Sequence, residues 1–339
     1  MSAPTMDHPE VGTDDRVALD VTDLTVDLRT PTGTVRAVDH VSFRARRGET
    51  LALLGESGCG KSMTAQALVG LLDPIAEVAD GSIVIDDVDL VSAKESVRRQ
   101  MAGTELAIVF QDALTALNPV YPVGTQLAEP FRIHRKMSRK KARQEAIELM
   151  RHVGIPEPES RIDSYPHQFS GGMRQRLLIA MAVALSPKVL LADEPTTALD
   201  VTVQAQIMAL LQRLREEHDM AVVLITHDLA LVAEQADRVA IMYAGNVVET
   251  GPVAEVFGDP KHPYTKGLLD SVPVSAERGA DLKSIGGTPP DLHSIPSGCV
   301  YQARCPIARS LCVQQRPALA GVGENRAAAC HFSEETSNV

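Results

Sequence analysis

The stretch Gly55-Glu56-Ser57-Gly58-Cys59-Gly60-Lys61-Ser62 decides the fold of this chain of 339 residues. It follows an apolar run at residues 51–54 and precedes a helix-like run at residues 63–72. A glycine-rich loop between a strand and a helix directs backbone N–H groups and the helix N-terminus at an anion. In the G-x-x-x-x-G-K-S pattern, Lys61 would reach the β- and γ-phosphates of a nucleotide and Ser62 would bind Mg²⁺. The stretch predicts a nucleotide site more strongly than a glycine-rich turn with a chance lysine.

Composition restricts the class of protein. The net charge of −11 argues against binding to nucleic acid or directly to anionic lipid. The longest apolar run, residues 177–185, is shorter than the roughly 18–20 residues that span a bilayer. The first residues are polar and acidic, without the apolar segment of a signal peptide. We therefore expect a cytoplasmic protein, and its length allows one large α/β domain with a smaller appendage or two ordinary domains.

Hydrophobic periodicity organises the chain. Apolar residues spaced by two over residues 17–46 predict strands. Short apolar runs that alternate with helical patterns, up to about residue 250, predict a parallel sheet with covered faces. Residues 124–164 have helix-spaced apolar positions and predict a helical insertion. The expected parts are a disordered tail at 1–16, a nucleotide-binding domain at 17–258 with a helical subdomain at about 113–186, an extension at 259–332 and a frayed tail at 333–339.

Two adjacent carboxylates, Asp193 and Glu194, follow the apolar run at residues 189–192. In a protein with a phosphate-binding loop, a carboxylate at the end of a neighbouring strand holds Mg²⁺, and Asp193 suits this role. The side chain of Glu194 points differently, toward a water that could attack the γ-phosphate. The alternative is a pair of solvated acids at a strand end, which the lysine loop makes the weaker interpretation.

A second anion site is predicted at Ser170-Gly171-Gly172, before the helical run at residues 173–185. Ser170 is a good N-cap, and the two glycines leave backbone N–H groups exposed at a helix N-terminus. The alternative is an ordinary capped helix. The chain would then carry two anion-binding sites, this one and the phosphate loop, for one nucleotide. This suggests an oligomer that pairs the two kinds of site.

Together these motifs resemble those of the ATP-binding-cassette (ABC) ATPase subunits. The matching segments are residues 55–62 (Walker A), 170–175 (signature), 189–194 (Walker B with the catalytic glutamate), 198–200 (D-loop), Gln111 (Q-loop) and His227 (switch histidine). The resemblance implies an ABC-type P-loop fold of the α/β class. Its parts would be a mostly parallel core sheet, an N-terminal antiparallel β subdomain, a helical insertion and a small irregular Cys-rich extension.

The resemblance also implies how the residues act. Two cassettes would sandwich two ATPs, with Glu194, His227 and Gln111 catalytic. Taken alone, His227 would more often be a structural histidine. The residues implied to bind Mg²⁺ are Ser62, Gln111 and Asp193. The residues implied to bind ATP are Gly55, Glu56, Ser57, Gly58, Cys59, Gly60, Lys61, Ser62, Met63, Ser170, Gly171, Gly172 and Asp200.

A narrower resemblance is to the ATPase subunits of oligopeptide/dipeptide importers. The segments that carry it are residues 110–112, 117–119, 165–176, 193–206, 262–265 and 298–306. It implies a peripheral subunit on the cytoplasmic face of the membrane. The implied partners are two transmembrane permease subunits, a second and paralogous ATPase, and an extracytoplasmic peptide-binding protein.

Three alternatives to peptide import remain. The first is the same role in an importer of nickel or glycosides, since other subunits select the cargo. The second is a soluble ABC ATPase of translation or DNA repair, but the chain has no second cassette and no coiled-coil or zinc-hook insertion. The third is a non-hydrolysing nucleotide switch, which the intact Glu194 and His227 disfavour.

The chain departs from the family at three places. Cys59 occupies a loop position often held by another small residue, and we interpret it as a packing residue that takes no part in catalysis. The family usually stacks adenine on an aromatic residue upstream of Walker A, yet Phe43 is the one aromatic in residues 1–54 and lies close to the loop. An aliphatic or arginine side chain would then contact the adenine, and the sequence does not identify it. Ala113 also stands where proline is common after Gln111-Asp112.

Four of the five cysteines gather near the C-terminus, at Cys299, Cys305, Cys312 and Cys330. A cytosolic protein is not expected to hold structural disulfides, and four thiolates suit zinc or an iron–sulfur cluster. The spacing lacks the C-x2-C pair common in zinc ribbons. Some members of the importer subfamily hold a [4Fe–4S] cluster here. The resemblance therefore favours this cluster first, zinc second and unmetallated thiols third.

Overall fold

The computed structural model describes residues 16–111, 116–197, 199–271 and 285–338. The tail expected at 1–16 lies, except for Arg16, outside the described residues, as do Asp112, Ala113 and Ala198. No helix in the described part of the chain is long and apolar enough to cross a membrane.

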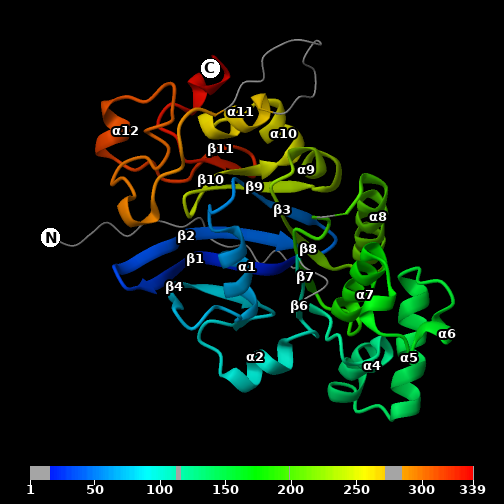
Figure 1. The fold of residues 1–339 in the computed structure, drawn as a ribbon. Coiled ribbons are helices and arrows are strands. Elements are labelled where there is room, and N and C mark those ends of the chain that lie inside the picture. Colours follow the sequence, from blue (N-terminus) through cyan, green and yellow to red (C-terminus); the bar gives the residue numbers. More distant parts are fainter. Residues whose placement is uncertain (1–15, 112–115, 198, 272–284, 339) are drawn as a thin grey trace.

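The centre of the molecule is a sheet with the strand order β11-β12-β10-β9-β3-β8-β7-β6 (Figure 1). Strands β9, β3, β8, β7 and β6 are parallel, and β10, β12 and β11 continue the sheet in antiparallel fashion. The parallel strands are continuous apolar runs because both faces of this sheet are covered. The bounds are β3 (Thr50–Leu54), β6 (Leu106–Val109), β7 (Val189–Asp193), β8 (Ala221–Thr226), β9 (Arg238–Tyr243), β10 (Asn246–Pro252), β11 (Ala320–Gly323) and β12 (Arg326–Ala328).

An antiparallel sheet of order β2-β1-β4-β5 packs against the central sheet. Its strands are β1 (Val17–Thr30), β2 (Gly33–Arg46), β4 (Ala76–Ile85) and β5 (Val88–Asp89). The alternating apolar residues predicted this sheet, since they bury one face of β1 against the core. Both the mostly parallel core and the N-terminal antiparallel sheet are therefore confirmed.

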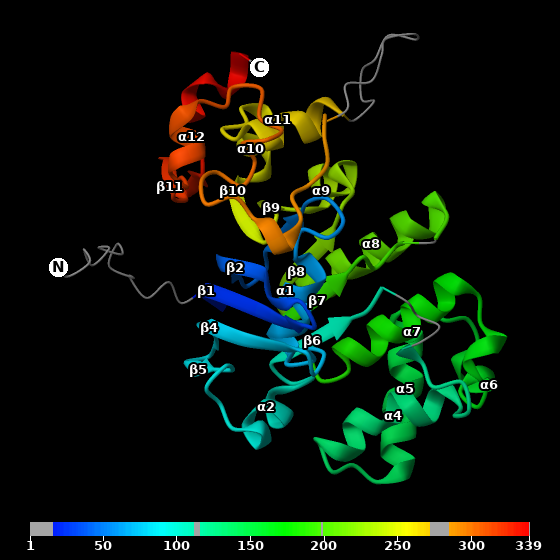
Figure 2. The same ribbon diagram turned by 60° about the vertical axis from the view of Figure 1, so that its left-hand side comes forward.

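Helices cover one face of the central sheet, while α1 and the antiparallel sheet cover the other (Figure 2). The helical insertion contains α4, α5, α6 and α7, and it lies at the opposite end of the molecule from the C-terminal extension in both views. The α-helices are α1 (Lys61–Val69), α2 (Glu95–Met101), α4 (Val123–Ile133), α5 (Arg139–His152), α6 (Pro158–Arg161), α7 (Gly171–Val183), α8 (Val201–His218), α9 (Leu229–Gln235), α10 (Val253–Gly258), α11 (Pro263–Asp270) and α12 (Ser310–Gln314). The 3-10 helices are η1 (Pro166–Gln168), η2 (Leu292–Ser294) and η3 (Ser333–Asn338).

The C-terminal extension is more integrated than its sequence indicates. Strand β12 pairs with β10, so the extension adds β11 and β12 to the central sheet. The Arg326 guanidinium donates to the Glu249 carboxylate at 2.9 Å, and both side chains are buried. The last residues are not the frayed tail expected from 333, because η3 packs on α11 and buried Thr336 donates to the carbonyl of Lys261 at 3.1 Å. These contacts join segments far apart in the chain, so the weak hydrophobic periodicity of the extension did not predict them.

Candidate nucleotide-binding site

The phosphate loop runs from the end of β3 to the start of α1, as its sequence predicts. Two of its glycines are required by close packing. A Cβ at Gly55 would lie 2.3 Å from the carbonyl oxygen of Met242. Gly60 has a φ of 104°, and a Cβ there would lie 2.7 Å from the carbonyl oxygen of Ala37. The loop is therefore pressed against strands β9 and β2, and larger residues would displace it.

Lys61 begins α1 and is 6% exposed. Its ammonium lies inside the curl of the loop, where Nζ donates to the carbonyls of Gly55 at 2.7 Å and Glu56 at 3.0 Å. Cys59 is buried beside it, and burial raises the pKa of this thiol. A protonated, buried thiol agrees with the interpretation that Cys59 packs the loop and takes no part in catalysis.

A cavity of about 720 Å³ opens over the loop. It brings together residues from the loop, the carboxyl ends of the parallel strands β3, β6, β7 and β8, the antiparallel sheet and the extension. Gln111, Glu194 and His227, predicted as a group from the sequence, all line it. The other lining residues are Leu28, Ala37, Leu54, Gly55, Glu56, Ser57, Gly58, Gly60, Lys61, Ser62, Met63, Leu268 and Leu292.

Glu194 is the centre of a hydrogen-bonded group at the wall of this cavity. Its Oε1 lies 2.9 Å from Nδ1 of His227. Its Oε2 accepts from Nε2 of Gln111 at 2.9 Å and from Oγ1 of Thr197 at 2.9 Å. Burial alone would raise the pKa of Glu194, but hydrogen bonds from His227 and Thr197 outweigh it and lower the pKa. The group therefore holds an ionised carboxylate in a fixed position, which is what a base for a water molecule requires.

Thr197 is the member of this group that the sequence did not reveal. It follows Glu194 by three residues in the turn after β7, and the backbone N–H of Thr197 donates to the carbonyl of Glu194 at 3.2 Å. A Ser or Thr at this short spacing after a carboxylate is a signal that could have identified it, because its hydroxyl can return to the acid.

Asp193 ends β7, and its Oδ1 atom is buried with no hydrogen-bond partner among the described residues. Burial and the neighbouring charge of Glu194 raise its pKa, while Lys61 and Ser62 oppose this shift. A buried carboxylate oxygen without a donor is costly unless a cation or proton satisfies it. The donor set therefore fits Mg²⁺, which prefers carboxylate and hydroxyl oxygen ligands.

The residues of the second predicted anion site do not line this cavity. Ser170 caps α7 by accepting from the N–H of Met173 at 3.3 Å, and both Ser170 and Gly171 are exposed. Gly172 lies so close to α8 that a Cβ there would be 2.6 Å from Val203. Asp200 is exposed and caps α8. Within a single chain, the residues of the second anion site and Asp200 therefore lie on a different surface from the phosphate loop.

The four C-terminal cysteines line one small cavity of about 10 Å³, and none of them is in a disulfide. Burial raises the pKa of Cys305 and Cys330 to about 11 and also raises that of Cys299. The charges of neighbouring cysteines also raise the pKa of Cys305 and Cys330. Four thiols around one space suit a cationic group, because a metal displaces the protons of the thiols that bind it.

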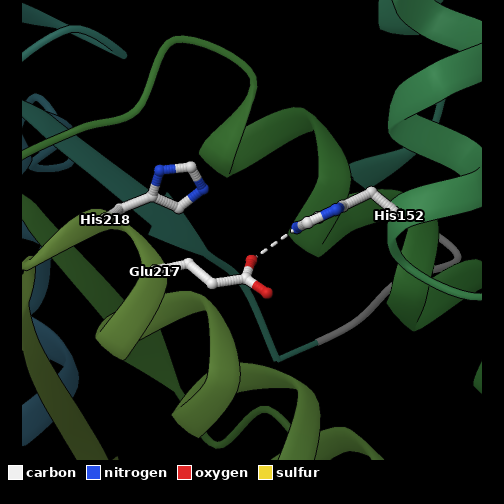
Figure 3. Close-up of side chains that lie close together, drawn as sticks. All are labelled: His152, Glu217 and His218. Carbon is white, nitrogen blue, oxygen red and sulfur yellow. Dashed lines mark hydrogen bonds and ion pairs between the residues drawn. The ribbon is translucent and has the colours of Figure 1, made fainter.

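Among the described residues, His152, Glu217 and His218 alone place three potential ligand atoms within 4.8 Å of one another (Figure 3). The cluster joins the carboxyl ends of α5 and α8, and Nε2 of His152 lies 2.7 Å from the Glu217 carboxylate. Arg213 also donates to Glu217, at 3.4 Å. The contacts of His152 and Arg213 with the Glu217 carboxylate account for this cluster without a metal.

Comparisons with known proteins agree with the fold. The family described as ABC transporter matches residues 38–197, and the oligopeptide/dipeptide transporter C-terminal region matches residues 248–312. The dipeptide transport ATP-binding protein DppD of Bacillus subtilis is 52% identical over 88% of this chain and 90% of its own length. DppD of Escherichia coli is 46% identical over 93% of this chain and 96% of its own. The oligopeptide transport ATP-binding protein OppD of Bacillus subtilis is 47% identical over 90% of this chain and 86% of its own length.

Solved structures give the same class. A dimeric ATP-binding cassette in a post-hydrolysis state, bound to ADP and Pi, has a TM-score of 0.62 and 26% identity over 69% of this chain and 98% of its own. The protein cbiO1 of Clostridium perfringens, part of an ABC transporter complex, has a TM-score of 0.60 and 28% identity. The match covers 75% of this chain and 95% of cbiO1. The fold and site thus define an ABC ATPase. More narrowly, the chain belongs to the ATP-binding proteins of the oligopeptide/dipeptide transporter family.

Proposed function

We propose that this chain is the ATP-hydrolysing subunit that drives a peptide importer from the cytoplasmic face of the membrane. One observation carries the assignment of hydrolysis: Gln111, Thr197 and His227 hold the ionised Glu194 at the wall of the phosphate-loop cavity. A chain that only bound nucleotide would have no need for this fixed carboxylate. The peptide cargo is inferred from relatives that are named as dipeptide and oligopeptide transport proteins.

Within this proposal, the loop N–H groups and Lys61 bind the phosphates, and Lys61 exchanges the carbonyls it now contacts for phosphate oxygens. Ser62, Asp193 and Gln111 would hold Mg²⁺, which neutralises charge on the phosphates. Glu194 orients the attacking water and accepts its proton. His227 keeps the Glu194 carboxylate in place and reaches the γ-phosphate. Leu28, Ala37 and Leu292 provide the apolar wall for the nucleoside, in place of an aromatic residue.

A second cassette completes the site. The exposed Ser170, Gly171 and Asp200 lie away from the phosphate loop of their own chain, together with Gly172. The backbone N–H groups of Gly171 and Gly172 at the start of α7 suit the γ-phosphate bound by a partner chain. The importer resemblance makes that partner a paralogous ATPase.

The membrane partners are two permease subunits, served by an extracytoplasmic peptide-binding protein. A cavity of about 710 Å³ suits a permease segment and is lined by apolar residues of α1, α2, β6 and α7. Leu71 at its rim is 57% exposed and Phe110 39% exposed. The cavity ends beside Gln111, which also bonds to Glu194, so occupation of the cavity and hydrolysis would be coupled.

The importer assignment is tested with the complete transporter in vesicles. We expect peptides to stimulate ATP hydrolysis, while nickel and glycosides do not. Lys61→Ala should abolish both nucleotide binding and hydrolysis, because it removes the charge inside the loop. The exposed Lys94 provides a control, since Lys94→Ala should leave both unchanged. If nickel or a glycoside alone stimulates ATP hydrolysis, the peptide cargo is refuted but the assignment as an ATPase stands.

The extension, residues 259–332, would carry a [4Fe–4S] cluster on Cys299, Cys305, Cys312 and Cys330. Zinc is the alternative. The observation that supports a metal group here is that all four thiols line one small cavity. The importer resemblance places the cluster before zinc.

Anaerobic purification tests the cluster. The protein should be brown, with broad absorbance in the visible range, and Cys312→Ser should remove the colour. A colourless protein that contains one zinc by metal analysis would instead establish the alternative. Cys59→Ser is the matched control, since this fifth cysteine lies in the phosphate loop and should leave the colour unchanged.

A further inference from the structure

The C-terminal extension reaches into the nucleotide site through one residue of the phosphate loop, Glu56. The Arg304 guanidinium donates to both carboxylate oxygens of Glu56, at 2.7 and 3.1 Å. The Arg304 side chain is only 4% exposed, and the Glu56 side chain is 28% exposed. Bidentate pairs of this kind are directional and, when shielded from water, are among the stronger polar contacts in proteins.

A second contact holds the backbone of the same residue. The N–H of Glu56 donates to the Tyr264 hydroxyl at 3.0 Å, and Tyr264, in α11, is fully buried. The carbonyl of Glu56 accepts from Nζ of Lys61 at 3.0 Å. The side chain and N–H of Glu56 are therefore fixed by the extension, while its carbonyl contacts the lysine at the centre of the loop.

Arg304 itself is held rigidly. Its Nη1 also donates to the Tyr243 hydroxyl at 3.3 Å, and its Nε donates to the carbonyl of Gly286 at 2.9 Å. The guanidinium lies over the rings of Tyr243 and Tyr301, 5.7 and 6.0 Å from their centroids. Contact with Glu56 keeps the pKa of Arg304 above its usual value, so the guanidinium stays charged.

The aromatic residues around Arg304 join the extension to the central sheet. Tyr243 ends β9, and its ring centroid lies 4.7 Å from that of Tyr264 and 5.2 Å from that of Tyr301. Three of the five tyrosines of this chain, in which aromatic residues make up only 3%, meet at this one point. The extension also contributes Leu268 and Leu292 to the wall of the nucleotide cavity.

We infer that Arg304 and Tyr264 are positioning residues for nucleotide binding, which act by fixing Glu56 and with it the phosphate loop. The inference rests on the proposed function, because it concerns the same site. The ligand is the triphosphate of a nucleotide with Mg²⁺. The extension thus forms part of the nucleotide site and is not only an appendage to the ATPase domain.

The test measures the affinity of the full chain for MgAMP-PNP, a non-hydrolysable ATP analogue, by titration calorimetry. Arg304→Lys keeps the charge but loses the bidentate geometry, and should weaken binding about tenfold. Tyr264→Phe keeps the ring and loses the acceptor for the Glu56 N–H, and should weaken binding about fivefold. Both variants should raise KM for ATP more than they lower kcat, since the hydrogen-bonded side chains around Glu194 are unchanged.

A double-mutant cycle separates positioning from general stability. If Arg304 acts through Glu56, Arg304→Lys should have no further effect on affinity once Glu56→Gln is present. Arg309→Gln is the matched control, because this arginine of the extension pairs with Glu335 and lies over Phe332, away from the loop. Its affinity for MgAMP-PNP should equal that of the wild type.

Other outcomes are decisive. Wild-type affinity in both Arg304→Lys and Tyr264→Phe would overturn the inference. An equal loss of affinity on Arg304→Lys in the presence and absence of Glu56→Gln would also overturn it. If Arg304→Lys does not fold, as thermal unfolding would show, Tyr264→Phe decides alone. Failure of the wild type itself to bind MgAMP-PNP, or binding that survives Lys61→Ala, would instead refute the proposed nucleotide site.

Discussion

At the scale of single residues, the proposed chemistry centres on Glu194 and on three side chains that come from different segments. Gln111 follows β6, Thr197 lies in the turn after β7 and His227 follows β8. Because β6, β7 and β8 are parallel neighbours, their carboxyl ends meet at one edge of the sheet. Glu194 has a φ of 43°, a left-handed conformation that is costly for a residue with a side chain. Its hydrogen bonds to three partners hold it in that conformation.

Glu194→Gln tests the role of the carboxylate directly. The amide keeps the size of the side chain but cannot accept a proton, so turnover should fall by roughly 10²–10⁴-fold. Binding of ATP should persist, and the variant should accumulate as a nucleotide-bound dimer in size-exclusion chromatography. Full ATPase activity would refute the assignment of the base. Gln144→Glu, on the exposed face of α5, is a control for the exchange of an amide and an acid.

Residue-scale prediction from sequence succeeded where a motif fixes geometry and failed where contacts are distant. The loop, the adjacent carboxylates and His227 each follow an apolar strand, so a parallel sheet brings them together. Arg304 and Glu56 are 248 positions apart, and no periodicity connects them. The sequence did place Arg304 beside Cys305, but only the packing of the extension shows what the guanidinium contacts.

At the scale of elements, the helical insertion depends on a close contact between α4 and the segment after α6. Gly124 is buried, and its N–H donates to the carbonyl of Ile162 at 2.9 Å. A Cβ at Gly124 would lie 2.4 Å from Cγ1 of Ile162 and 2.5 Å from its carbonyl oxygen. The backbone of Ile162 cannot move aside without breaking this hydrogen bond. The contact therefore fixes how α4 meets the rest of the insertion.

Gly124→Ala should destabilise the chain by about 1–3 kcal/mol, which is the usual cost of overpacking in a core. Thermal unfolding of the purified protein measures this loss. Gly258→Ala, at the end of α10, is the matched control because a Cβ there meets nothing within 4 Å. Alanine has the higher helix propensity, so the control should be as stable as the wild type or slightly more stable. Equal stability of the two variants would contradict the close contact.

The elements of the extension show why sequence patterns lose power there. β11 and β12 are short and rich in alanine and glycine, which have little intrinsic preference for strands. They form because β10 offers an open edge with which β12 can pair. The helical insertion, in contrast, has apolar residues at helical spacing that bury one face of α5. Local periodicity predicted the insertion, whereas the extension is determined by long-range pairing.

At the scale of the whole molecule, the nucleotide site lies between two parts that differ in sequence character. The helical insertion approaches it through Gln111, and the extension approaches it through Arg304 and Tyr264. The apolar cavity that we propose receives a permease segment is bordered by α1 and α7, so it touches both the loop-bearing helix and the insertion. A segment that enters this cavity could therefore alter the position of the insertion relative to the phosphate loop. Transport requires such a coupling between distant surfaces.

Leu71→Asp tests this coupling without changing the chemistry. Leu71 lies just beyond α1, lines the cavity and is 57% exposed, so aspartate there should not disturb folding. A charge in an apolar interface must be desolvated, which should prevent the ATPase from co-purifying with its permease subunits in mild detergent. ATP hydrolysis by the isolated chain should stay within about twofold of the wild type, since the substitution lies outside the group around Glu194. Val313→Asp, an equally exposed apolar position in α12, should leave the complex intact. Loss of the complex in both variants, or in neither, would exclude this cavity as the specific docking site and leave the permease contact to another surface of the insertion.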